Sequence, residues 1–264
     1  MTIKQTEYVL ESEEESSRLS NQHDIIKDEM GGLVLAPVDL SKPLRILDSA
    51  TADGTYQHGF RLPSASPRRT WADLLGTWIR DLASSTAPVE HQFVGTDLEG
   101  SNFPASPPAG QTYQVQDMNQ PWPEEWKGSF DLVHQRLALV GAGPGGQQVI
   151  EKLAALVKPG GWMQLIEATN NLPEEDGPAM RNLVTVMKGV FKTYGASLNL
   201  GTELPGMLSA AGFEDVQSRI ANTKLGAINP NKQLARQGVY STMIAARGLA
   251  KFGGSKCLYC PSIA

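Results

Sequence analysis

The chain contains only two cysteines among its 264 residues, and both lie near the C-terminus, at Cys257 and Cys260. The rest of the sequence cannot form disulfides, which suits a reducing compartment. The two cysteines form a single CxxC without a second pair of ligands, so no metal site is expected. We predict a disordered tail over residues 253–264.

Excess positive charge and long apolar runs are also absent. The formal net charge is -5 at a sequence pI of about 5.4, and Lys and Arg are scattered, which argues against nucleic-acid binding. No run approaches the roughly 20 apolar residues of a membrane span. The N-terminal residues MTIKQTEYVLESEEESS are acidic, unlike a cationic targeting leader. We expect a cytoplasmic protein, or a nuclear one if it is a regulator, with a small-molecule or protein partner.

Short β-rich runs alternate with segments of helical spacing over most of the chain, which predicts an α/β fold with a largely parallel sheet. We expect an N-terminal helical flank or lid over 1–41 and one domain over 42–252. The predicted strands are 44–48, 93–97, 112–117, 129–136, 162–168 and 213–221. The predicted helices are 8–28, 71–85, 147–157, 174–194, 203–211 and 233–252. Residues 158–161 are expected to end the helix at 147–157.

A turn of small residues follows the first predicted strand. The run LRILDSATADGT carries Asp48 at the strand end and then Ala50, Ala52 and Gly54. Small side chains let backbone N–H groups approach a ligand closely. Taken alone, the turn fits an ordinary strand-to-helix connection as well as a cofactor loop, because the Gly-x-Gly-x-x-Gly fingerprint is missing.

Three acidic residues stand at or just after the ends of three successive strands: Asp48, Asp97 and Asp117. Three acids at three successive strand ends are a much stronger signal of a binding site than any one of them alone. Asp97 has the position of a carboxylate that accepts ribose hydroxyls. Asp117 and Asn119 suit the adenine amino group, while Met118 can pack on the ring. The set predicts a nucleoside cofactor site.

Six blocks together resemble the fungal class I S-adenosylmethionine-dependent methyltransferases of secondary metabolism, which include relatives of a global regulator of those pathways. They are YVLESEEESSRLSNQH (8–23), LRILDSATADGT, FVGTD, QDMNQPWP, FDLVHQR and LVKPGGWMQLIEA. The resemblance extends to about Arg247. It implies a Rossmann-like, seven-stranded methyltransferase sheet with helices on both faces, and S-adenosyl-L-methionine as cofactor. The cofactor-binding residues that it implies are Asp48, Ala50, Ala52, Gly54, Asp97, Asp117, Met118, Asn119 and Gln135.

Two histidines are candidate catalytic bases. His134 matches the strand end that faces the methyl group in the family, and His23 lies in the N-terminal flank. A base is needed only if the acceptor must lose a proton. Each histidine could equally pack or bind cofactor without proton transfer. Glu167 ends the fifth strand and is a candidate to face the acceptor. Trp122 and Trp126 could roof the pocket, stack on a flat acceptor, or belong to the core.

The stretch Thr55–Gly76 separates the turn from its helix, although such connections usually take about 2–6 residues. Deleting it gives LDSATADGTWIRDLASS, which restores the family pattern. Gly-Thr occurs at both ends, at Gly54-Thr55 and Gly76-Thr77. Either an intron has been translated here, which we favour, or the stretch is a genuine loop.

The resemblance implies methylation of an oxygen, nitrogen or sulfur atom of a small metabolite. Two alternatives stay open. A methyltransferase-fold cyclase or pericyclase could use the bound cofactor as a fixed positive charge without methyl transfer. A non-catalytic regulator of secondary metabolism could bind protein partners instead. No sequence motif specifies the acceptor or the oligomeric state.

Overall fold

The computed structural model describes residues 12–51, 77–98, 100, 103–169, 177–197 and 199–256. Predictions on Ala52, Gly54, Cys257 and Cys260, and on the stretch 55–76, lie outside these residues. All six predicted helices are present. Their bounds are α1 Ser12–Met30, α2 Thr77–Thr86, α3 Gly146–Ala154, α4 Pro178–Tyr194, α5 Leu200–Ala210 and α6 Lys232–Lys256.

Five parallel strands form one sheet in the order β3-β2-β1-β4-β5. Their bounds are β1 Arg45–Ser49, β2 Gln92–Asp97, β3 Gln111–Val115, β4 Phe130–Arg136 and β5 Val157–Ile166. The order reverses between β1 and β4, which is where ligands bind in open α/β sheets. Within the described residues the sheet has five of the seven implied strands. The predicted strand at 213–221 is wrong, because that segment pairs with no strand there.

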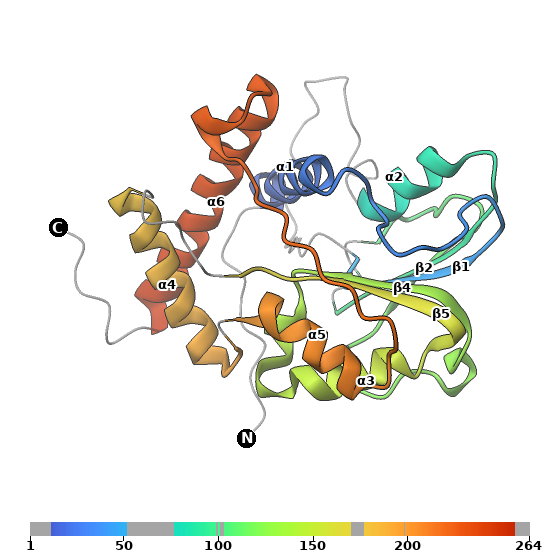
Figure 1. Ribbon diagram of the computed structural model, residues 1–264. Coiled ribbons are helices and arrows are strands. Elements are labelled where there is room, and N and C mark those ends of the chain that lie inside the picture. The colour runs from blue at the N-terminus through green and yellow to red at the C-terminus, as the bar shows by residue number, and fades with distance from the viewer. Residues whose placement is uncertain are drawn as a thin grey trace.

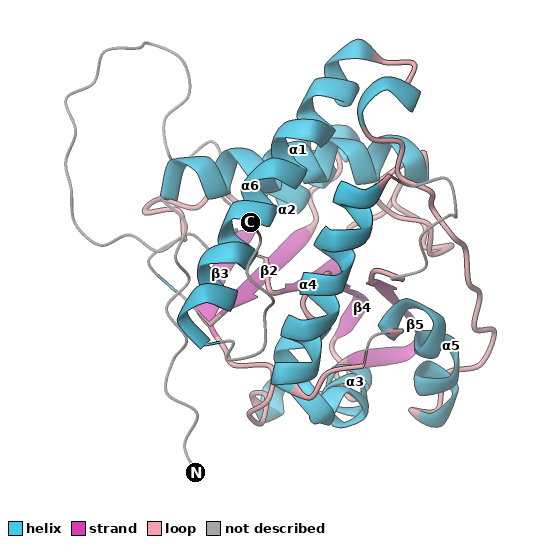
Figure 2. Ribbon diagram, turned by 90° about the vertical axis from the view of Figure 1, so that its left-hand side faces the viewer, coloured by secondary structure: helices cyan, strands magenta, loops and turns pink. Residues whose placement is uncertain are grey.

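Helices cover both faces of the sheet, as the resemblance implies. Figure 1 shows α1 and α2 on one face and α3 and α5 on the other, with α4 and α6 together at one side. The view turned by 90° shows the same layers (Figure 2). The N-terminal helix α1 packs against α6, so the first and last described helices lie side by side. No helix within the described ranges is long and apolar enough to cross a membrane.

Each face of the sheet has its own apolar core. Successive strand residues point to opposite faces, so Ile46 packs with α2 residues while its neighbour Leu47 packs with α3 residues. Both are fully buried. Burial of such a side chain contributes about 1.5–3 kcal/mol. Trp122 and Trp126 lie in the core on the α3 side, where Trp126 meets Phe130 edge-on at 5.5 Å between ring centroids. Of the roles considered for the two tryptophans, packing in the core is the one observed.

The prediction that residues 158–161 end a helix is wrong. Helix α3 ends at Ala154, and 158–161 already belong to β5. The pairing register shifts there, since Phe130 pairs with Val157 and Leu132 with Trp162. Gly160 has φ 76°, which glycine adopts at little steric cost. The Pro-Gly-Gly sequence therefore forms an irregular start of the strand.

Candidate active site

The carboxyl ends of the strands form one edge, and the backbone is strained at two points along it. Ala50, just after β1, has φ 59°, and Leu137, just after β4, has φ 52°. Such left-handed conformations are costly for residues other than glycine and collect at ligand sites. The alanine at position 50 is thus where the loop would accept glycine most readily.

Asp48 and His134 form a buried pair at the centre of this edge. They are direct neighbours on β1 and β4, and His134 Nδ1 lies 2.7 Å from Asp48 Oδ1. The side chain of His134 is 1% exposed and that of Asp48 is 5% exposed. The indole of Trp78, on α2, stacks on the imidazole at 3.9 Å with an angle of 2° between the planes. The Trp78 N–H in turn donates to the Leu33 carbonyl at 3.3 Å.

This environment fixes the state of His134. A carboxylate only accepts, so Nδ1 carries the proton that it donates to Asp48. Burial lowers the pKa of His134; the Asp48 hydrogen bond and charge oppose this, and the Arg136 charge adds to it. The other nitrogen, Nε2, is buried and makes no hydrogen bond within the described residues. The geometry is that of a neutral imidazole holding Asp48 in place, and the role of His134 as a base stays a prediction.

Residues predicted for the cofactor lie on both sides of this pair. Gln135 donates to Ser49 Oγ at 3.1 Å and lies 3.5 Å from Met118 Sδ, which brings β1, β4 and the loop after β3 together. Asp97 ends β2 and is half-buried. Each of these residues lies at or after the end of its strand, and their binding of the cofactor stays a prediction.

Asp117 and Asn119 have a more local arrangement. Asp117 Oδ1 accepts the backbone N–H of Asn119 at 2.9 Å and its side-chain N–H at 3.1 Å. The Asn119 amide also lies 3.5 Å from the Gly141 carbonyl. These bonds shape the loop that presents Met118 to the edge.

His23 links helix α1 to the sheet. Arg136 Nη2 lies 3.2 Å from His23 Nδ1, and His23 Nε2 lies 3.0 Å from Asp81 Oδ2 of α2. An arginine only donates, so Nδ1 accepts and Nε2 carries the proton. Lys27 also donates to Asp81, at 2.7 Å. Both nitrogens of His23 are therefore engaged in holding α1 against α2 and β4, and its role as a base stays a prediction.

We expect His23 to make the protein less stable in acid. Burial and the Arg136 charge lower its pKa below the ordinary 6.5, although Asp81 opposes the shift. Below about pH 6.5 the unfolded chain then binds more protons than the folded one, so stability falls as pH falls. The free energy of unfolding, measured with urea for the wild type and for His23→Gln, should differ most at pH 8 and become more similar as the pH is lowered to 5. Parallel pH dependences would contradict this.

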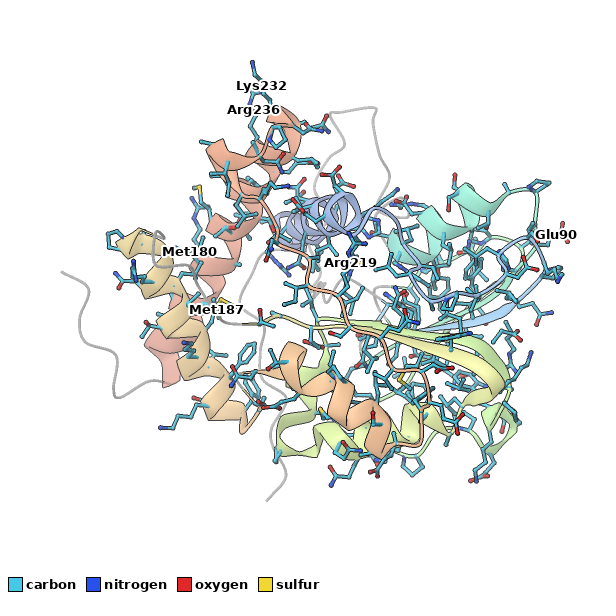
Figure 3. All side chains as sticks on the ribbon, in the orientation of Figure 1. Glu90, Met180, Met187, Arg219, Lys232 and Arg236 are labelled. Atoms are coloured by element: carbon cyan, nitrogen blue, oxygen red, sulfur yellow. The ribbon has the colours of Figure 1, made fainter. Side chains whose placement is uncertain are left out.

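A cavity of about 900 Å³ lies along β5 and reaches the carboxyl ends of β4 and β5 at Leu137 and Glu167, while Asp48, Asp97, Met118 and Gln135 are not among its lining residues. It is lined by Ile25 and Met30 of α1, by Leu137, by the stretch Trp162–Thr169 and by residues 213–221. Figure 3 shows Arg219 on this last segment, close to α1; its guanidinium donates to the Met30 carbonyl at 3.0 Å. The volume is in the range of small-molecule pockets, about 300–1,000 Å³.

Comparison with known proteins gives the family. The chain is 34% identical over 238 residues to N-methyltransferase sirN of Leptosphaeria maculans, covering 88% of this chain and 75% of sirN. It is 33% identical over 257 residues to N-methyltransferase tcpN of Claviceps purpurea (strain 20.1), covering 94% of this chain and 83% of tcpN. The chain belongs to this family of fungal S-adenosylmethionine-dependent methyltransferases.

The fold agrees with that family. The putative methyltransferase solved in complex with the Haloferax volcanii Trm112 methyltransferase activator matches this methyltransferase with a TM-score of 0.53 at 14% identity. The match covers 92% of this chain and 95% of that one. No family model matches the sequence. The comparisons confirm the expected family and the Rossmann-like fold.

The edge has unsatisfied polar groups that fit a bound S-adenosylmethionine. Thr51 Oγ1, Thr96 Oγ1 and His134 Nε2 are buried at or beside the strand ends and have no hydrogen-bond partner among the described residues. Buried polar atoms of this kind are normally satisfied. The described part of the chain brings no group of three or more His, Cys, Asp or Glu together that could hold a metal ion.

Sequence reasoning missed three residues of the site. Trp78 and Asp81 were read only as part of a helix, and Arg136 only as the end of a strand. Their roles depend on α2 lying over the ends of β1 and β4, which no local pattern in the sequence specifies.

Proposed function

We propose that this methyltransferase transfers a methyl group to a nitrogen atom of a small, largely apolar secondary metabolite. The observation that carries the proposal is the cavity of about 900 Å³ that runs along β5 to the ends of β4 and β5, with apolar residues of α1, β5 and α5 and the segment 213–221 in its wall. The names of sirN and tcpN, both N-methyltransferases, support nitrogen as the acceptor atom.

Asp97, Met118 and Gln135 would hold S-adenosylmethionine, which supplies an electrophilic methyl group when bound. Asp97 would accept the ribose hydroxyls, and Met118 would pack on the adenine ring. The Asp48–His134 pair would fix the end of β1 from which the turn starts. The cavity would then place the acceptor atom beside this edge, and proximity supplies much of the rate enhancement.

The test of this proposal is incubation of the protein with methyl-labelled S-adenosylmethionine and a fungal metabolite extract. We expect label in a small nitrogen compound, with the methyl group located by mass spectrometry. Label on oxygen or sulfur would contradict the nitrogen assignment. A cofactor-dependent product without label would indicate the cyclase alternative. Absence of cofactor binding in calorimetry would contradict both the methyltransferase and the cyclase hypothesis.

Asp97→Ala should weaken S-adenosylmethionine binding about 10- to 100-fold, because a hydrogen bond to a charged group is worth about 1.5–3 kcal/mol. The matched control is Glu90→Ala. Glu90 is exposed and precedes β2, so it lies at the opposite end of the same strand (Figure 3). Calorimetry should find its affinity unchanged. Equal losses in the two variants would contradict a specific contact of Asp97 with the cofactor.

A further inference from the structure

Glu167 is the first residue after β5 and lies at the same edge as the Asp48–His134 pair. Ile166, just before it, pairs with Arg136 at the end of β4. The chain turns sharply at Leu137, so the backbone N–H groups of Ala138 and Leu139 both donate to Glu167 Oε1, at 3.0 and 2.8 Å. The carboxylate is therefore held rigidly where β4 and β5 end.

Only one oxygen of Glu167 is used in this way. Oε2 makes no hydrogen bond within the described residues, and Glu167 lines the cavity. A carboxylate with one oxygen fixed by the backbone and the other unengaged is arranged to accept a proton from a molecule in that cavity.

The pKa of Glu167 suits a group that accepts a proton from a molecule in the cavity. Burial raises the pKa of Glu167 to about 7, against the lowering effect of the two backbone hydrogen bonds. The charged groups that line the cavity with it are Glu214, Asp215 and Arg219, all on the segment after α5, and none of them is a cause of the shift. A base poised near neutral pH is the most efficient at neutral pH.

We propose that Glu167 is the proton acceptor of the methyl transfer and that it selects an N–H acceptor. This rests on the proposed function. The nitrogen lone pair forms the new N–CH₃ bond, the S–CH₃ bond breaks, and its electron pair stays on sulfur. The proton of the nitrogen passes to Glu167 Oε2, which later returns it to water.

The proposal narrows the acceptor class. A neutral amine attacks with its lone pair, and the methylated ammonium that results has an N–H acidic enough for the carboxylate of Glu167 to accept its proton, whereas an alcohol is too weak an acid for this base to ionise. The apolar walls favour an amine carried on a hydrophobic skeleton.

The probe for the test is sinefungin, a cofactor analogue with a primary amine in place of the methyl sulfonium. Its ammonium would lie where the methyl group is transferred. We expect the wild type to prefer sinefungin over S-adenosylhomocysteine, and the preference to rise from pH 6 to pH 8 as Glu167 ionises. In Glu167→Gln the preference at pH 8 should fall at least about tenfold, as expected for loss of a charge-assisted hydrogen bond.

The control is Glu203→Gln, on α5. Its side chain accepts from Ser197 Oγ at 2.6 Å and does not line the cavity. It should keep the wild-type preference. Glutamine at 167 can still accept both backbone N–H groups, so unchanged affinity for S-adenosylhomocysteine serves as the check on folding. If Glu167→Gln kept the wild-type preference and pH dependence, the role of Glu167 would be overturned while cofactor binding stood. If the wild type bound neither molecule, the proposed function itself would fail.

An independent readout needs no ligand. In protein labelled with ¹³C at the glutamate carboxyl carbon, one resonance should titrate near pH 7 in the wild type and be absent from Glu167→Gln. A wild-type spectrum in which every glutamate titrates near its ordinary value would overturn the assignment of Glu167 as the base.

Discussion

Replacing Asp48 by alanine should abolish measurable S-adenosylmethionine binding and lower the free energy of unfolding by about 1–3 kcal/mol. The reason for the loss of stability is His134, whose Nδ1–H would have no acceptor inside a site that is closed to water. The reason for the loss of binding is the turn that follows Asp48, where Ala50 is held at φ 59°. A strained backbone conformation is kept only when the surrounding structure holds it. Without the Asp48 side chain the end of β1 is held less firmly, so we expect Ala50 to leave this conformation.

Asp48→Asn separates the two effects. Its side-chain oxygen can still accept from His134 Nδ1 at the observed position, so urea unfolding should show a smaller loss than for Asp48→Ala. Calorimetry with S-adenosylmethionine then reports whether the negative charge itself is needed. If Asp48→Ala unfolded at the wild-type urea concentration and bound cofactor normally, the Asp48–His134 pair would have neither role.

The sequence predicted the helices well, because each has helical spacing of apolar residues and a polar opposite face. Helix α2 is an example: its apolar residues Trp78, Ile79 and Leu82 have helical spacing, and all three are buried. Strands β1 and β4 were equally clear, since strands buried on both faces read as short continuous apolar runs.

The failed strand at 213–221 has a physical explanation. A strand is stable only when its backbone groups pair with a neighbouring strand. The run FEDVQSRIA has no alternation of apolar and polar residues, and nothing in it shows that a partner strand is in reach. In the structure the segment crosses between α5 and α1 and lines the cavity beside β5 instead.

The sequence predicted the strand-end positions of the candidate site residues, but it did not predict which of their side chains contact each other. Asp48 and His134 were each placed at a strand end, but their direct contact depends on β1 and β4 being neighbours in the sheet. Likewise, the position of His23 depends on α1 packing over Asp81 and Arg136, which lie 58 and 113 residues further along the chain. Such long-range pairings carry no local signal, so only the assembled fold shows them.

The stretch Thr55–Gly76 falls between β1 and α2, and the bounds of these two elements show how long their connection would be without it. Strand β1 ends at Ser49, and α2, as described, begins at Thr77, which would directly follow Gly54 in a shortened chain. Only residues 50–54 would then connect the two elements, within the usual length of about 2–6 residues. Thr77 and Trp78 are already buried against the sheet, as a helix that follows a short cofactor loop requires.

Deleting Thr55–Gly76 should therefore keep the fold and tighten S-adenosylmethionine binding at least about tenfold, which corresponds to about 1.4 kcal/mol. A shorter connection between β1 and α2 costs less conformational entropy to close into the loop that the cofactor needs. Calorimetry compares the deletion with the full chain, and urea unfolding checks that the shortened protein is folded. Deleting and restoring the stretch in an Asp97→Ala background controls for nonspecific effects, since the gain should depend on a working site.

Sequencing the transcript gives the matching genetic result: codons 55–76 absent from the message. A message that keeps them, with full-length protein binding the cofactor as tightly as the deletion, would show that the stretch is a genuine part of the enzyme.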